Sequence, residues 1–311
     1  MHIVNTLVPV FLIIAIGVAL RRSNFLTSEL VSGISKLTYW VALPCLLFYE
    51  VANAQYDFGM ASKTFLVVVS GMAGCIVISF VTALLLRMPV SSIGTFVQGC
   101  YRGNLAYIGL PVLIYSFSNT DQADADRFRT IAVLVLALMV PIYNILAVIF
   151  LLASQHRLDR HVSIKIFRQT ITNPLFLSCI FGVVYSLFFK GLAFPIDRTF
   201  KAISAMALPL SLLTIGASLS EEKVGGYLKV SILASIIKLA VGPVIGLIML
   251  KLLSLGAGQA RVAMIFLACP TAVASYIMTD QLGGDRGLSA KIVVLTSILS
   301  VISLGLVVAF F

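Results

Sequence analysis

Apolar residues are gathered into long stretches that short polar segments separate. Ten of these stretches are long enough, at about 20 residues each, to cross roughly 30 Å of hydrocarbon as helices. They occupy residues 3–20, 30–49, 64–86, 93–117, 130–153, 172–189, 199–219, 229–250, 260–281 and 288–310. The pattern therefore predicts an all-α polytopic membrane protein with ten transmembrane helices.

Two short sequences recur at one spacing. PVFLIIAIGV (9–18) shares five of ten positions with PLFLSCIFGV (174–183), and ALPCLL (42–47) recurs as ALPLSL (207–212), 165 residues later in both cases. The repeat predicts two five-helix halves, 1–153 and 172–311, joined by the linker 154–171. Because five is odd, the second half enters the membrane in the opposite orientation. Inverted repeats of this kind allow alternating access in secondary transporters.

Composition and charge restrict the class further. Hydrophobic residues make up 60% of the chain and charged residues 11%, against roughly 25% charged residues in soluble domains. The net charge of +10 would suggest nucleic acid in a soluble chain, but here the basic residues lie mostly in short loops and helix ends. We interpret them as a positive-inside bias, with the basic linker in the cytoplasm, both termini outside and no nucleic-acid partner.

The fourth span contains groups that a lipid-facing helix disfavours. The stretch YRGNLAYIGLPV (101–112) places Arg102 and Asn104 at membrane depth, followed by Tyr107, Gly109 and Pro111. Proline removes a helical hydrogen bond and clashes with the preceding turn. Unwound backbone at this depth is tolerated only where it is buried in protein or lines a water-filled cavity. The sequence therefore predicts a broken helix at a binding cavity.

The ninth span carries the matching feature at the corresponding position of the second half. ACPTAVASYIMTD (268–280) holds Pro270 near its middle, with Thr271, Ser275 and Tyr276 beyond it. Two broken helices that meet would direct the N–H groups of their half-helices at a common midpoint, and such a midpoint favours an anion.

Five polar residues in or at the ends of apolar spans have two alternative roles each. Arg102 either binds a substrate carboxylate or clamps backbone carbonyls of the broken helix. Lys238, in the eighth span, either serves the site or extends its ammonium to the interface, and Asn144 either joins helices or contacts the substrate. Glu50 and Asp280, at span ends, are candidates for proton or sodium coupling, with an interfacial position as the alternative.

No cofactor, metal ion or enzymatic activity is expected. The five cysteines lie within predicted spans without a CxxC spacing, and no GxxxxGK[ST] motif occurs, so the driving force would come from the substrate, the membrane potential or a coupled ion. A sodium- or proton-coupled carrier or antiporter would be expected to carry paired acidic residues at mid-membrane, and none is present. A membrane receptor of transporter-like architecture would bind with the same residues, and only flux distinguishes it from a carrier.

Four motifs together resemble the auxin efflux carrier family, which includes bacterial malonate-type carriers and plant PIN-formed carriers. They are RGNLAYIGLP, CPTAVASYIMTDQLGGD, the two ALP motifs and IKLAVGP. The resemblance implies two inverted five-helix repeats, a scaffold part and a transport part, and an organic anion bound where helices 4 and 9 cross. It also implies elevator-type alternating access, often in a homodimer.

Carried onto this sequence, the resemblance matches Asn104 and Pro111 to the first crossover and Pro270, Ser275 and Tyr276 to the second. The chain departs from some bacterial members at Ala274, where they have Asn, and from plant carriers in its short central linker. We expect a secondary transporter of a small organic anion, a carboxylate, in a bacterial inner membrane. The expected substrate-binding residues are Arg102, Asn104, Tyr107, Gly109, Pro111, Asn144, Lys238, Pro270, Thr271, Ser275 and Tyr276.

Overall fold

The computed structural model describes the whole chain except residues 1, 54–57, 119, 156–171, 190 and 220–227. The linker predicted at 154–171 therefore lies almost entirely outside the described residues. All named secondary structure in the described ranges is helical. The chain forms two compact units: unit 1 comprises Met1–Ala61, Ala106–Val140 and Ile171–Glu221, and unit 2 comprises Ser62–Leu105, Pro141–Thr170 and Glu222–Phe311. Each unit draws residues from both predicted halves.

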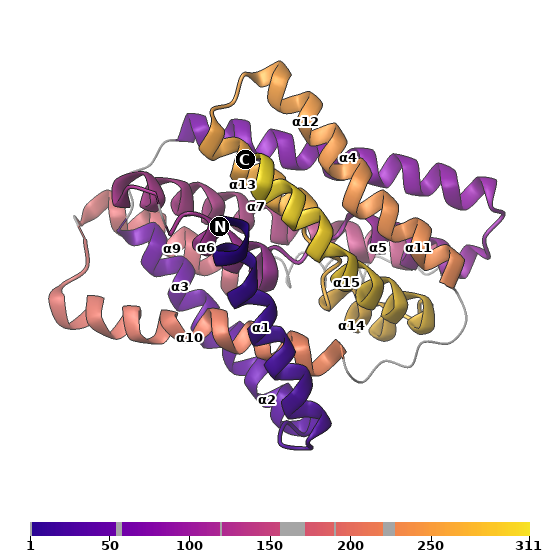
Figure 1. Cartoon of the computed structure of the whole chain (residues 1–311), viewed down its shortest axis with the longest axis horizontal. Helices are drawn as coiled ribbons and strands as arrows, with labels where there is room; N and C mark the ends of the chain where they lie inside the picture. Colours follow the sequence, from indigo (N-terminus) through magenta and orange to yellow (C-terminus); the bar gives the residue numbers. More distant parts are fainter. Residues whose placement is uncertain (1, 54–57, 119, 156–171, 190, 220–227) are drawn as a thin grey trace. The chain divides into compact units, whose positions relative to one another are not determined.

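Unit 1 is built on two pairs of packed helices, α1 with α10 and α3 with α9, which Figure 1 labels. Its helices are α1 (His2–Arg22), α2 (Ser28–Leu37), α3 (Leu43–Ala52), α6 (Leu110–Ser116), α9 (Pro174–Phe188), α10 (Phe194–Leu219) and the part of α7 (Gln122–Ser154) up to Val140. All four copies of the recurring sequences lie in this unit. The first predicted span thus packs on the seventh and the second packs on the sixth.

Glycines bring these helices to close backbone approach at equivalent places. A Cβ on Gly17 would lie 2.3 Å from the carbonyl oxygen of Leu213, and a Cβ on Gly182 would lie 3.2 Å from that of Phe48. Gly17 and Gly182 are separated by the spacing of the sequence repeat, and so are Phe48 and Leu213. One helix contact therefore occurs twice in unit 1, once for each copy of the repeat.

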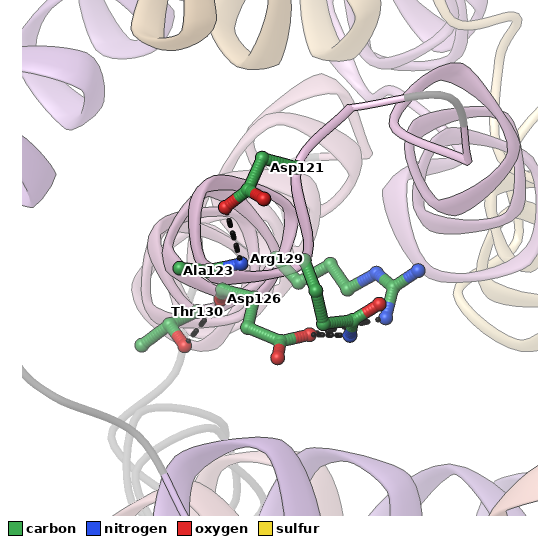
Figure 2. Close-up of polar contacts among 6 residues, drawn as sticks. Asp121, Ala123, Asp126, Arg129 and Thr130 are labelled. Carbon is green, nitrogen blue, oxygen red and sulfur yellow. Dashed lines mark hydrogen bonds and ion pairs between the residues drawn. The ribbon is translucent and has the colours of Figure 1, made fainter.

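Acidic residues lie just before and within the first turns of α7 (Figure 2). Asp121 accepts a hydrogen bond from the backbone N–H of Ala123 at 3.1 Å, one of the N–H groups that a helix start leaves without a partner. Asp126 pairs with Arg129 at 3.3 Å, and its carbonyl oxygen accepts from Thr130 Oγ1 at 2.9 Å. These carboxylates stabilise the helix start, where the macrodipole favours negative charge.

Unit 2 contains both helix breaks, residues 102–104 and 269–273. Its α15 packs against α5, α11, α13 and α14. The helices are α4 (Phe58–Leu85) from Ser62 on, α5 (Val90–Tyr101), α7 from Pro141 on, α11 (Leu228–Ile236), α12 (Gly242–Leu253), α13 (Ala257–Ala268), α14 (Ala274–Gln281) and α15 (Arg286–Phe310). Close approach again relies on glycine, since a Cβ on Gly94 would lie 2.3 Å from the Phe150 carbonyl oxygen.

Three short π-helical segments each precede a proline. They are η1 (Thr38–Ala42), η2 (Leu105–Gly109) and η3 (Ile237–Val241). Pro44, Pro111 and Pro243 follow in the first turn of α3, α6 and α12. A proline ring clashes with the carbonyl four residues earlier in a regular α-helix. The wider π turn relieves that clash, so the span continues past the proline.

Six helical segments are long and apolar enough to cross a membrane in the part of the chain that the structure describes. They are Ser28–Ala52, Gly59–Leu85, Gln122–Ser154, Phe194–Ser218, Leu228–Leu253 and Arg286–Phe310, with shorter apolar helices at Leu105–Ser116, Pro174–Phe188 and Ala257–Ala268. Large apolar side chains such as Leu12, Val77 and Ile302 remain exposed, which suits a surface that faces lipid. The expectation of a helical polytopic membrane protein is confirmed at this level.

Candidate functional site

Both predicted helix breaks are present, but their prolines occupy different places. Helix α5 ends at Tyr101 and helical structure resumes at Leu105, while α13 ends at Ala268 and α14 begins at Ala274. Pro270 lies inside the second break. Pro111 lies beyond the first one, in the opening turn of α6, a position that proline tolerates.

The two breaks cross each other as an antiparallel pair within unit 2. Gly103 and Thr271 form an isolated β-bridge at the crossing. Two backbone hydrogen bonds accompany it: Asn104 N–H to the Pro270 carbonyl, 2.8 Å, and Ala272 N–H to the Arg102 carbonyl, 3.0 Å. Because these backbone groups bond to one another, they avoid the free-energy cost of burying an unpaired N–H or carbonyl. Attraction for an anion therefore has to come from other groups than these two N–H donors.

Thr271 ties the crossing to the helices on either side. Its hydroxyl donates to the Gly99 carbonyl at 2.6 Å, and its backbone N–H donates to Thr296 Oγ1 at 3.1 Å. Gly99 lies in the last turn of α5, where carbonyls lack helical N–H partners. The fully buried Thr271 side chain thus supplies a missing donor to the end of α5.

Arg102 is buried at the crossing with 6% of its surface exposed. Its Nη2 donates to Asn144 Oδ1 at 2.7 Å and its Nη1 contacts Met278 Sδ at 2.6 Å. Asn144 comes from the part of α7 in unit 2 and Met278 from α14, so three separate segments meet at the guanidinium. Asn144 is a helix-joining residue and a neighbour of the cation at once.

Lys238 lies beside the same crossing. It sits in η3 with 2% of its surface exposed, and its Nζ donates to the Leu267 carbonyl at 3.0 Å. A Cβ on Gly103 would lie 3.5 Å from this nitrogen. The alternative of an ammonium extended to the membrane interface is therefore wrong, and unit 2 buries a second cationic side chain next to the broken segments.

The α14 helix presents a polar face to α5. Thr279 Oγ1 donates to Gln98 Oε1 at 3.3 Å, and Ser275 lies one turn earlier on the same helix. Among the described residues, Gln98 Nε2 and Ser275 Oγ are buried without a hydrogen-bond partner. Gln98 and Met278 were not among the site residues predicted from the sequence. Gln98 had a visible signal, an amide inside an apolar span, whereas nothing in the sequence singles out Met278.

Other predicted residues lie elsewhere. Tyr276 accepts a hydrogen bond from Arg286 Nη2 at 3.0 Å, and Arg286 also pairs with Asp280 at 3.0 Å on an exposed part of unit 2. Tyr107 and Gly109 belong to η2 and, like Pro111 and the half-buried Glu50 of α3, are part of unit 1. Unit 2 thus brings together Arg102, Asn104, Asn144, Lys238, Pro270, Thr271 and Ser275.

Apolar helices interrupted at a common place are a feature of many membrane transport proteins. A family model described as membrane transport protein matches residues 2–308. The chain belongs to this family, the auxin efflux carrier family, and is a multi-pass membrane protein. No curated protein matches the chain.

Proposed function

We propose that this chain is a secondary transporter that binds a small organic anion, a carboxylate, at Arg102 in unit 2. The observation that carries the proposal is the buried guanidinium at the crossing of the two broken segments, held by Asn144 and Met278. An ionised side chain at membrane depth costs at least ~3 kcal/mol on insertion scales, so its presence there points to a function.

The contacts of Arg102 suit an exchangeable ligand. The thioether sulfur of Met278 is a weak hydrogen-bond acceptor, whereas a carboxylate accepts two parallel hydrogen bonds from a guanidinium. A substrate carboxylate that replaces the sulfur would therefore gain a stronger interaction. Lys238, beside Gly103, adds a second positive charge to the same region.

The packing supports a transport cycle built on an internal repeat. The contact between Gly17 and Leu213 recurs between Gly182 and Phe48, as expected if two five-helix repeats are related by a pseudo-twofold axis. We assign the scaffold role to unit 1 and the transport role to unit 2, so that the anion moves with unit 2 in an elevator-type cycle. We retain the bacterial inner membrane, the cytoplasmic central linker and the homodimer as parts of this proposal.

Ligand-induced thermal stabilisation of the purified protein tests the binding step. At 100 times its dissociation constant, an anion should stabilise the wild type by ~2.7 kcal/mol, and Arg102→Ala should abolish this shift. Arg261→Gln is the matched control, because Arg261 lies about two turns before the end of α13 and donates to the Phe311 carbonyl at 2.8 Å. Equal shifts in all three proteins would remove Arg102 from the site.

Uptake into proteoliposomes separates a carrier from a receptor of similar architecture. The vesicles are loaded with unlabelled acid, and the labelled acid is added outside. A carrier exchanges the two, so that label accumulates inside the vesicles, while a receptor binds the label without flux. Repeating the assay with collapsed proton and sodium gradients distinguishes uniport or exchange from the alternative of a coupled carrier. Binding with no flux under any gradient would contradict the transport proposal.

A further inference from the structure

Three buried polar side chains in this part of unit 2, Gln98, Tyr101 and Ser275, have a hydrogen-bonding group without a partner among the described residues. Two of them, Gln98 of α5 and Ser275 of α14, lie on helices that contact each other and carry an amide and a hydroxyl donor. Gln98 and Ser275 have 0% and 1% of their surfaces exposed. Gln98 Nε2 and Ser275 Oγ have no hydrogen-bond partner in the described part of the chain. Polar groups buried without partners are rare because each one is costly, so a concentration of them next to a candidate site calls for a ligand.

The two side chains come from α5 and α14, two helices that contact each other. Gln98 contacts Thr279 at 3.3 Å, which directs its amide at α14. Ser275 precedes Thr279 by four residues and therefore lies on the same helix face. Three residues before Ser275, Ala272 N–H donates to the Arg102 carbonyl, and this bond belongs to the crossing. Ser275 thus lies at a level between the crossing and the contact of Gln98 with Thr279.

The guanidinium of Arg102 belongs to the same part of unit 2, where the end of α5 meets α14. Arg102 follows Gln98 by four residues, its backbone N–H donates to the Gln98 carbonyl at 3.1 Å, and its side chain contacts Met278, the neighbour of Thr279. One helical turn spans about 5.4 Å. Because Gln98 and Arg102 are one helical turn apart along the chain, we take about one turn as the separation between a carboxylate at Arg102 and a group bound by Gln98 and Ser275.

We propose that Gln98 and Ser275 bind a second oxygen of the substrate, so that the preferred anions are short carboxylates with a further hydrogen-bond acceptor about one helical turn from the carboxylate. This inference rests on the proposed function and defines its substrate class. Gln98 Nε2 and the Ser275 hydroxyl donate to the second acceptor, and Arg102 binds the carboxylate. Monocarboxylates with an apolar tail leave both donors unpaired and bind more weakly.

The test compares acids of one shape. Succinamate and 4-methylpentanoate have the same branching, but only succinamate ends in a carbonyl acceptor, and succinate adds a second charge. Thermal stabilisation of the purified full chain gives the affinity for each acid. We expect wild type to prefer succinamate and succinate over 4-methylpentanoate by about tenfold or more, since sites built to hydrogen-bond reject analogues that lack the partner group.

Two variants and one control locate the preference. Gln98→Met and Ser275→Ala should each reduce the preference by about tenfold and leave the affinity for 4-methylpentanoate unchanged. Ser231→Ala in α11 is the control, because its hydroxyl is likewise buried without a partner among the described residues. Both serine variants should raise the melting temperature of the ligand-free protein, since each removes a buried unpaired group. Only Ser275→Ala should alter the preference.

The outcomes separate this inference from the proposed function. If carboxylates stabilise the wild type and Arg102→Ala abolishes the effect, but Gln98→Met and Ser275→Ala keep the wild-type preference, the second-oxygen site is refuted and the proposed function stands. A wild type that binds 4-methylpentanoate as well as succinamate also refutes the inference. If no acid stabilises the wild type, both proposals fail.

Discussion

Replacement of Thr271 by valine should loosen the crossing of the two broken segments. The substitution keeps the shape of the side chain and removes the hydroxyl that donates to the Gly99 carbonyl at 2.6 Å. That carbonyl then remains buried without this donor, at a cost of about 1–3 kcal/mol. Since each 1.4 kcal/mol is a factor of ten, local opening of the crossing should become roughly 5- to 150-fold more frequent.

Two cysteines report this opening directly. Cys100 follows Gly99 and Cys269 precedes the crossing, and both have 0% of their surface exposed. The assay uses a background in which the remaining free cysteines are replaced by alanine: Cys45, Cys75 and Cys179. Where reclosing is faster than alkylation, the rate of reaction with N-ethylmaleimide follows the opening equilibrium. The rate should therefore rise by the same factor in Thr271→Val.

The matched control is Thr82→Val in α4. Thr82 Oγ1 donates to the Ile78 carbonyl at 2.7 Å within its own helix. When this hydroxyl is lost, the carbonyl still has the backbone N–H four residues later as its helical partner. Thr82→Val should leave the alkylation rate within about twofold of the background. The reasoning is refuted if Thr271→Val is no faster than the background, or if both variants accelerate equally.

Two further predictions concern stability. Gly17→Ala should lower stability by about 1–3 kcal/mol because its Cβ meets the Leu213 backbone. Gly182→Ala should cost less because the nearest neighbour of its Cβ is a Val51 side chain, and Gly33→Ala, whose Cβ meets no neighbour, should be neutral or stabilising. Thermal melts rank the three variants, and equal shifts would show that these contacts do not set the cost. Asp285→Ala should cost about 0.5–2 kcal/mol, since Asp285 caps α15 by accepting from Leu288 N–H at 3.0 Å; a melt equal to wild type would argue against the cap.

Local features of the fold follow from the sequence because their causes are local. Pro111 and the nearby glycines, with Arg102 and Asn104 in the same apolar span, predicted the first break, and Pro270 with the polar residues after it predicted the second. The prediction erred on Pro111, which lies in the first turn of α6 instead of in the break. The π turn η2 before it accommodates the ring, and no residue type in LAYIG marks such a turn in advance.

Partners of the candidate site follow from packing that residue spacing does not encode. Arg102 contacts Asn144 and Met278, which are 42 and 176 residues away in sequence. The recurring motifs predicted a division into halves, whereas the compact units combine residues from both halves, because helices pack on partners from the other copy of the repeat. Lys238 shows the same limit, since its burial depends on the Leu267 carbonyl of another helix.

The crossing at Gly103 and Thr271 also sets a condition on how the protein is made. At about 5–20 residues per second, Thr271 leaves the ribosome on the order of 10–30 s after Gly103. During that interval the Asn104 N–H and the Arg102 carbonyl lack the Pro270 and Ala272 groups that bind them in the finished protein. Lipid offers no substitute for these partners. Until the ninth span arrives, the fourth span therefore has to satisfy these groups in another way, with water in the translocation channel or by continuing as a regular helix. The crossing itself can form only after the second half of the chain has been made.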